Sequence, residues 1–190
     1  MKKFGKMVLW VVVGLIVVIG ALSVVSPTSA KIHLEEEVNA PADEVWAVLA
    51  HRFAEIGDWA PNIEWSRAIT QDQIPDGFVV APSAPVPGRV TPNPLGDVSE
   101  VLTVYSEEER AFTFDADGLP AIVTHTTNST RVTELDDGRS LVTFDVDMGL
   151  VRPFNVLAPL IEGRIQTSKA GPGGMIKDLK VYVESGQTSQ

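Results

Sequence analysis

Cysteine is absent from the 190 residues of the sequence. Its absence excludes disulfide bonds, thiolate nucleophiles and thiolate metal ligands at the same time. Histidine is scarce as well, since the chain holds three, and no two of them have the spacing of metal ligands on one helix face. We therefore expect neither a metal site nor a cofactor.

Basic residues are few relative to acidic ones, with 15 Lys and Arg against 25 Asp and Glu and a net charge of −10. Three of the lysines, Lys2, Lys3 and Lys6, lie at the N-terminus, so the remainder of the chain is more acidic still. An acidic domain repels phosphate backbones and anionic membrane surfaces. The composition therefore argues against nucleic acid as a partner and indicates a soluble domain.

Charge of either sign is missing from Met7 to Val25. At about 1.5 Å per residue this apolar run reaches about 28 Å as a helix, close to the hydrocarbon thickness of a bilayer. Residues 1–30 are therefore predicted to be a membrane anchor or a signal peptide cleaved near Ala30, and the length favours the anchor. The lysines ahead of the run favour a cytoplasmic N-terminus. The following domain is then extracytoplasmic, on the periplasmic or cell-surface side, or secreted after cleavage.

The remainder of the chain alternates between strand and helix patterns, with turn residues such as Asp137-Gly138 between them. The predicted strands are 31–38, 63–70, 88–91, 98–105, 111–116, 122–135 and 140–150, and the predicted helices are one that starts after Pro41, 54–59, 153–165 with Pro159 inside it, and one from Met175 onward. This order predicts an α+β fold, in which a curved antiparallel sheet of about six or seven strands packs around a C-terminal helix. We assign residues 31–186 to one domain and residues 187–190 to a frayed tail.

Several short segments occur in the order and spacing of a known superfamily. They are 38–46, 53–61, 88–90, 99–102, 137–140 and 178–184. On these segments the chain resembles the START-like, Bet v 1-like superfamily (SRPBCC) and, within it, the polyketide cyclase/dehydratase proteins. The resemblance implies a helix-grip fold with a ligand cavity between the sheet and a long C-terminal helix. It leaves the activity open, because members include lipid carriers, hormone receptors and cyclases.

Two segments depart from the pattern of that superfamily. The loop 71–87 is long and rich in proline, and Gly171-Pro172-Gly173-Gly174 precedes the last helix. We expect the second segment to break the helix and to act as a gate or hinge. Both departures are expected near the mouth of the cavity, where they would affect ligand size and access.

Large apolar residues are the candidates for lining the cavity. They are Trp59, Trp65, Phe112, Phe114, Phe144 and Met148. The alternative is ordinary core packing. In a curled sheet the two interpretations merge, because a cavity-lining residue is a core residue beside a gap.

Three polar residues are weak candidates for catalysis. Glu100 lies on a strand among apolar residues, where burial would raise its pKa, and Arg89 on a neighbouring strand is its candidate partner. His125 is a candidate general base. The alternatives are an outward ion pair for Glu100 and a structural role for His125. Asp145 and Asp147 share the strand face opposite the apolar one and are expected to face water.

These observations favour a binding domain for a small hydrophobic or lipid-like molecule, tethered to the membrane through residues 7–25 or exported. A second hypothesis is an enzyme of the cyclase/dehydratase type that uses Glu100, His125 or Arg89 inside the cavity. A third is an accessory protein whose membrane partner docks on the apolar stretch 153–161. The absence of a catalytic constellation favours the binding domain over the enzyme.

Overall fold

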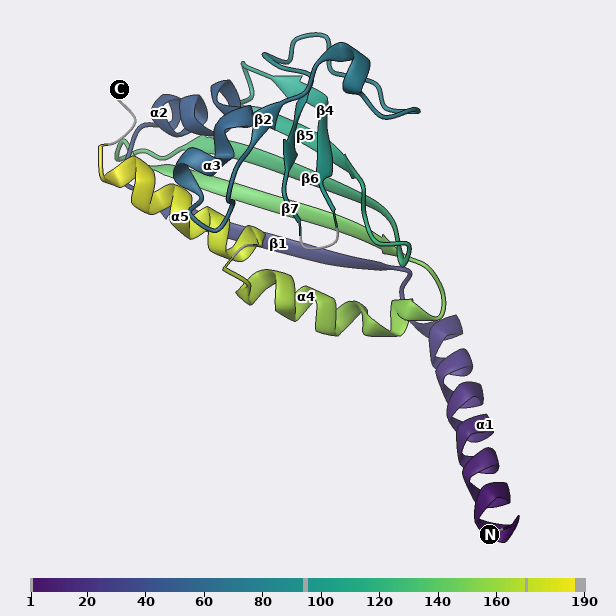
Figure 1. Cartoon of the computed structure of the whole chain (residues 1–190). Coiled ribbons are helices and arrows are strands. Elements are labelled where there is room, and N and C mark those ends of the chain that lie inside the picture. The colour runs from purple at the N-terminus through teal and green to yellow at the C-terminus, as the bar shows by residue number, and fades with distance from the viewer. Residues whose placement is uncertain (1, 94–95, 170, 187–190) are drawn as a thin grey trace.

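A seven-stranded antiparallel sheet forms the centre of the molecule, with the strand order β1-β7-β6-β5-β4-β3-β2 (Figure 1). The computed structural model describes residues 2–93, 96–169 and 171–186, so the predicted frayed tail at 187–190 lies outside the described residues. The strands are β1 (Ser29–Val38), β2 (Arg67–Ala68), β3 (Gly88–Thr91), β4 (Val98–Ser106), β5 (Ala111–Asp117), β6 (Val123–Glu134) and β7 (Ser140–Leu150). The predicted α+β class and curved antiparallel sheet are confirmed.

Helical segments precede the sheet, cover one of its faces and follow its last strand. They are α1 (Lys2–Val25), α2 (Ala42–Trp46), a π turn (Ala47–His51), 3-10 turns (Phe53–Glu55, Gln71–Gln73 and Phe154–Leu157), α3 (Ile56–Trp59), α4 (Ala158–Thr167) and α5 (Pro172–Glu184). Helices α2, α3 and α5 lie over the concave face of the sheet (Figure 1). This arrangement of a C-terminal helix on a curved sheet is the predicted helix grip.

The core lies between the concave face and these helices. Along β7, Val142 and Phe144 are buried in it, whereas the next residue, Asp145, is exposed. Val45 from α2 and Leu179 from α5 pack into the same cluster. Each such side chain contributes about 1.5–3 kcal/mol on burial. The period-two pattern of the strands therefore decides which face receives the helices.

The predicted strand at 63–70 is wrong over most of its length. Only Arg67 and Ala68 pair with β3. The next residue but one, Thr70, starts a 3-10 turn, because its side chain and that of Gln73 form a capping box around it. The local hydrogen bonds of Thr70 thus account for the end of β2, and residues 63–66 ahead of β2 form no strand.

The sequence predicts Pro159 in the interior of a helix over 153–165, but the proline lies at the start of a helix instead. The stretch that precedes it forms a 3-10 turn, Phe154–Leu157, and Pro159 then occupies the first turn of α4. The first backbone N–H groups of a helix have no acceptor within the helix, so the missing N–H of proline costs no hydrogen bond there.

The Gly171-Pro172-Gly173-Gly174 segment separates α4 from α5, so the expected helix break is present, and the role as a gate or hinge stays a prediction. Pro172 begins α5, and both following glycines are helical. A methyl group on Gly173 would lie 1.8 Å from the carbonyl oxygen of Gln166, and one on Gly174 would lie 2.1 Å from that of Lys169. The glycines therefore allow the start of α5 to pack directly on the end of α4, and the segment forms a close-packed helix corner.

Helix α1 projects away from the sheet and carries the apolar run (Figure 1). Its window Val8–Val25 has a mean hydropathy of 3.0, and 6% of that window is buried. A helix that is apolar all round and exposed over nearly its whole length is typical of a membrane span or a signal sequence. By length and composition α1 is able to cross a bilayer.

Candidate functional site

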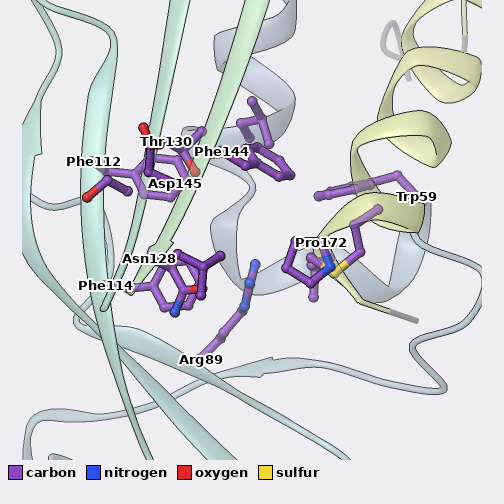
Figure 2. A pocket seen from close by; sticks show the side chains of 14 residues that line it. Trp59, Arg89, Phe112, Phe114, Asn128, Thr130, Phe144, Asp145 and Pro172 are labelled. Atoms are coloured by element: carbon purple, nitrogen blue, oxygen red, sulfur yellow. The ribbon is translucent and has the colours of Figure 1, made fainter. Parts of the chain in front are cut away.

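A cavity lies between the concave side of the sheet, α3 and the first turn of α5 (Figure 2). The cavity itself is small, about 40 Å³, and the space reaches about 420 Å³ only when the open region at the mouth is counted. The lining residues are Leu49, Ile56, Trp59, Arg89, Phe112, Phe114, Asn128, Ser129, Thr130, Phe144, Asp145, Val146, Pro172 and Met175. The cavity is thus a narrow, largely apolar site of the kind that binds small molecules.

Aromatic rings form one wall of the cavity. Phe112 and Phe114 alternate on β5 and share its inner face. Phe53, in the turn before α3, meets Phe112 edge-on at 5.4 Å and Phe114 at 5.6 Å between ring centroids. Such edge-to-face pairs add about 0.5–1.5 kcal/mol beyond the buried area. The rings are therefore held in place from behind and present a preformed apolar surface to a ligand.

Arg89 brings a positive charge to this apolar wall. Its residue is 4% exposed, and its guanidinium forms an ion pair with Glu100, its register partner on β4. It also donates a hydrogen bond to the backbone oxygen of Phe53 at 2.9 Å and lies 4.1 Å above the ring of Phe53. Figure 2 shows the guanidinium reaching in among the lining side chains. The site can therefore attract a ligand atom that carries negative charge or a lone pair.

Trp59 adds a hydrogen-bond donor from the opposite side. It ends α3, is 4% exposed and lines the cavity beside Pro172 of α5 (Figure 2). No described residue accepts a hydrogen bond from its buried indole N–H. A buried indole N–H usually has a partner, so this group is available to a ligand acceptor.

Polar residues of β6 and β7 border the cavity on the sheet side. Among them, Asp145 lies 2.7 Å from Nδ1 of His33 on β1, and the carboxylate is 56% exposed. The hydrogen bond to Asp145, and next that to Glu35, raises the pKa of His33 above its ordinary value. The Asp145 side chain is thus exposed on the outer face of the sheet together with His33, in agreement with the expectation that it faces water.

Four of the six apolar residues singled out in the sequence come together at the cavity. Trp59, Phe112, Phe114 and Phe144 all line it. The other two lie elsewhere. Trp65 packs against Ile69, Val90 and Val101 in a separate cluster, and Met148 packs with Ala30, Leu150 and Ala158 near the start of β1.

The three polar candidates for catalysis also lie in different places, and only one of them lines the cavity. Arg89 lines the cavity, and Glu100 supports Arg89 without lining the cavity itself. His125 lies on β6 with 56% of its side chain exposed and Nε2 at 3.8 Å from Asp147. An acid–base reaction inside the cavity would therefore need groups other than His125.

Sequence patterns missed the helical contributors to the site. Leu49 and Ile56 from the α2–α3 region and Met175 from α5 line the cavity, but each occurs in a helical pattern that any core helix would show. Across the described part of the chain, no group of three or more His, Asp or Glu side chains is arranged to hold a metal ion.

Comparison with known proteins gives a family match and several similar structures. The family model described as polyketide cyclase/dehydrase and lipid transport matches residues 29–170. The protein XoxI from Bacillus cereus is 23% identical, with a TM-score of 0.60 over 83% of this chain and 98% of that one. A START superfamily protein from Mycobacterium smegmatis is 15% identical, with a TM-score of 0.61 over 82% of this chain and 97% of that one.

An enzyme shares the fold as well. Norcoclaurine synthase from Thalictrum flavum, solved as a point mutant with a transition-state analogue, is 16% identical, with a TM-score of 0.58 over 86% of this chain and 99% of that one. None of the curated proteins matches the chain. At these identities the solved structures support a shared fold and no shared activity.

Proposed function

Because the chain belongs to the polyketide cyclase/dehydrase and lipid transport family, we propose that its folded domain binds a small apolar molecule in the cavity between the sheet and α5. The observation that carries this proposal is the composition of the lining. Aromatic rings make up most of one wall, and two buried donor groups, on Arg89 and Trp59, interrupt it. An apolar surface with a few placed polar groups is what a small-molecule site requires.

The lining also indicates the class of ligand. The space is narrow, and its walls are rings held by edge-to-face contacts. A flat, compact ring compound fits such a space better than a long acyl chain. Arg89 and Trp59 would both donate to an acceptor on the ligand, such as a carboxylate, phenolate or carbonyl oxygen. The proposed ligand is thus a small aromatic or polycyclic compound with one hydrogen-bond acceptor.

Filling the cavity tests this proposal. Met175 lines the cavity from α5, so Met175→Trp would occupy the space with an indole ring. Val181 lies on the same helix but is 68% exposed, which makes Val181→Trp the matched control. Each full-length protein is titrated with 2-naphthoate by isothermal calorimetry in nanodiscs.

We expect the unsubstituted protein and the Val181→Trp variant to bind 2-naphthoate with equal affinity. The Met175→Trp variant should bind at least about tenfold more weakly, a loss of about 1.4 kcal/mol. Equal affinities in all three proteins would place the binding outside this cavity. No binding to any of them would count against an aromatic acid as the ligand.

We further infer that residues 1–30 remain attached and hold residues 31–186 at the outer surface of a membrane. Asn155, fully buried in the turn before α4, supports this. Its side-chain amide donates to the backbone oxygens of Ser23 at 2.8 Å, Ser26 at 3.1 Å and Pro27 at 3.2 Å. Cleavage near Ala30 would remove all of these acceptors together with the segment that covers the amide, so the domain would lose hydrogen bonds worth about 0.5–1.5 kcal/mol each.

A further inference from the structure

Three apolar side chains stand exposed on the segment between β7 and α5. Phe154 is 43% exposed, Leu157 39% and Leu160 61%. Leu157 and Leu160 are three residues apart and share one face of the start of α4, while Ala158 between them is buried. We call Phe154, Leu157 and Leu160 the α4 patch. The site in the cavity uses none of these residues.

The α4 patch is fixed to the end of α1. Asn155, which follows Phe154 directly, binds the last turn of α1 and the residues after it through its amide. The hydroxyl of Ser23 in α1 donates back to Oδ1 of Asn155 at 2.6 Å. The two bonds between Asn155 and Ser23 are buried and the other two are partly buried, so together they hold α1 and the start of α4 as one corner.

The direction of α4 relative to α1 places the patch at the surface of any bilayer that α1 spans. In Figure 1, α4 runs crosswise to α1, along the side of the domain toward which α1 projects. A helix transverse to a membrane span, and joined to its outer end, lies parallel to the membrane plane. Apolar side chains on such a helix meet the boundary between headgroups and acyl chains.

The charges around the patch agree with this placement. Arg152 and Arg164 are exposed on either side of it, in a chain whose net charge is −10. The nearby carboxylate of Glu162 accepts a hydrogen bond from the backbone N–H of Lys31 at 2.9 Å. Arginine side chains flanking apolar residues suit an interface, where the charge extends toward phosphate groups while the stem stays among acyl chains.

We propose that the α4 patch docks on the lipid bilayer and so fixes the orientation of the domain on the membrane. This proposal rests on the proposed attachment through α1. The exposed apolar surface of α1 continues, through the corner at Asn155, into the patch. One bilayer would therefore cover both, and Leu160 would sit about 5–10 Å below the headgroup level.

A fluorescent label at the patch tests the proposal in the full chain. Because the sequence lacks cysteine, Leu160→Cys introduces a unique site for a nitrobenzoxadiazole label. Val79→Cys is the matched control, since Val79 is apolar, 76% exposed and in the loop between β2 and β3. Both proteins are reconstituted into phosphatidylcholine vesicles that contain a doxyl-labelled lipid, and flotation checks that each one is inserted.

We expect the lipid-borne doxyl group to quench the label at position 160, at a depth of about 5–10 Å, and to leave the label at position 79 unquenched. Adding Phe154→Ser and Leu157→Ser to the Leu160→Cys protein should at least halve the quenching. Both residues are exposed, so the fold should be retained.

The failures of the two proposals are distinguishable. A chain that does not float with the vesicles overturns the attachment through α1 and the docking together. A chain that floats but shows equal quenching at positions 160 and 79 overturns the docking alone. A label at 160 that is shielded from aqueous iodide without being quenched by lipid would place a second copy on the patch and also overturn it.

Discussion

Arg89 connects the core of the protein to the chemistry of the cavity. It is a buried cation whose compensation comes from three directions: the Glu100 carboxylate, the Phe53 carbonyl and the faces of two aromatic rings. Sequence reasoning found Arg89 and Glu100 together, because they were expected on neighbouring strands. It had no means of placing Phe53 beneath the guanidinium, since that contact joins a turn to a strand across the core.

Removing the partner of Arg89 should destabilise the protein strongly. In Glu100→Gln the guanidinium remains buried without its counter-charge, so we expect the free energy of unfolding to fall by about 3 kcal/mol. Glu37→Gln is the control, because Glu37 pairs with Arg139 at the surface and its loss should cost at most about 1 kcal/mol. Urea unfolding in detergent micelles measures both, and similar losses in the two variants would show that the Arg89 pair is not a buried one.

His33 provides a test of the outer face of the sheet by pH. Its pKa is raised, first by Asp145 and next by Glu35, so the protonated form is favoured in the folded state. The stability that this contributes is present in full below the ordinary pKa of about 6.5 and is lost as the pH rises through the raised value. Asp145→Asn should lower the pKa of His33, measured by NMR titration of the ring protons, more than Glu35→Gln does. An unchanged pKa in Asp145→Asn would contradict the hydrogen bond.

At the scale of elements, the corner between α4 and α5 positions the helical part of the cavity lining. Pro172 and Met175 reach the cavity from the first turn of α5, and that turn is set by the contact of Gly173 with Gln166 of α4. A glycine-proline cluster indicates a break in a helix, which is correct here, but it does not reveal that the broken ends pack on one another.

Gly173→Ala tests this corner. Its methyl group would overlap the backbone of Gln166, so we expect a loss of about 1–3 kcal/mol in the free energy of unfolding and weaker binding of 2-naphthoate. Gly163→Ala is the control within α4, since nothing lies within 4 Å of its new methyl group. That change should stabilise the helix by about 0.5–1 kcal/mol. Stabilisation by both substitutions would mean that the corner is open.

The elements that could be predicted are those that follow from short-range sequence signals, namely the alternation of apolar residues and the turn residues between strands. The hairpin of β6 and β7 followed from alternating apolar residues around Asp137-Gly138, and both strands are present. The strand at 63–70 is reduced to Arg67 and Ala68: hydrogen bonds at Thr70 end it, and 63–66 form no strand although the apolar pattern continues there. Trp65 and Met148 were assigned to the cavity because a period of two identifies a buried face but not which of several clusters that face joins.

The whole molecule combines a cavity, an apolar helix and an exposed patch. Asn155 links the helix to the patch, and the sheet between β1 and β7 links both to the cavity. If α1 spans a bilayer and the α4 patch lies on it, the cavity is held at a fixed height above the membrane surface. Such a domain would meet apolar compounds as they leave or enter the bilayer.

Native mass spectrometry of the full chain, purified from membranes in mild detergent, tests the central claim most directly. We predict a chain that retains residues 1–30 and carries a small apolar compound, which solvent extraction releases and which the Met175→Trp variant lacks. A protein that appears without any bound compound in every preparation, and that takes up neither 2-naphthoate nor lipid, would contradict the account.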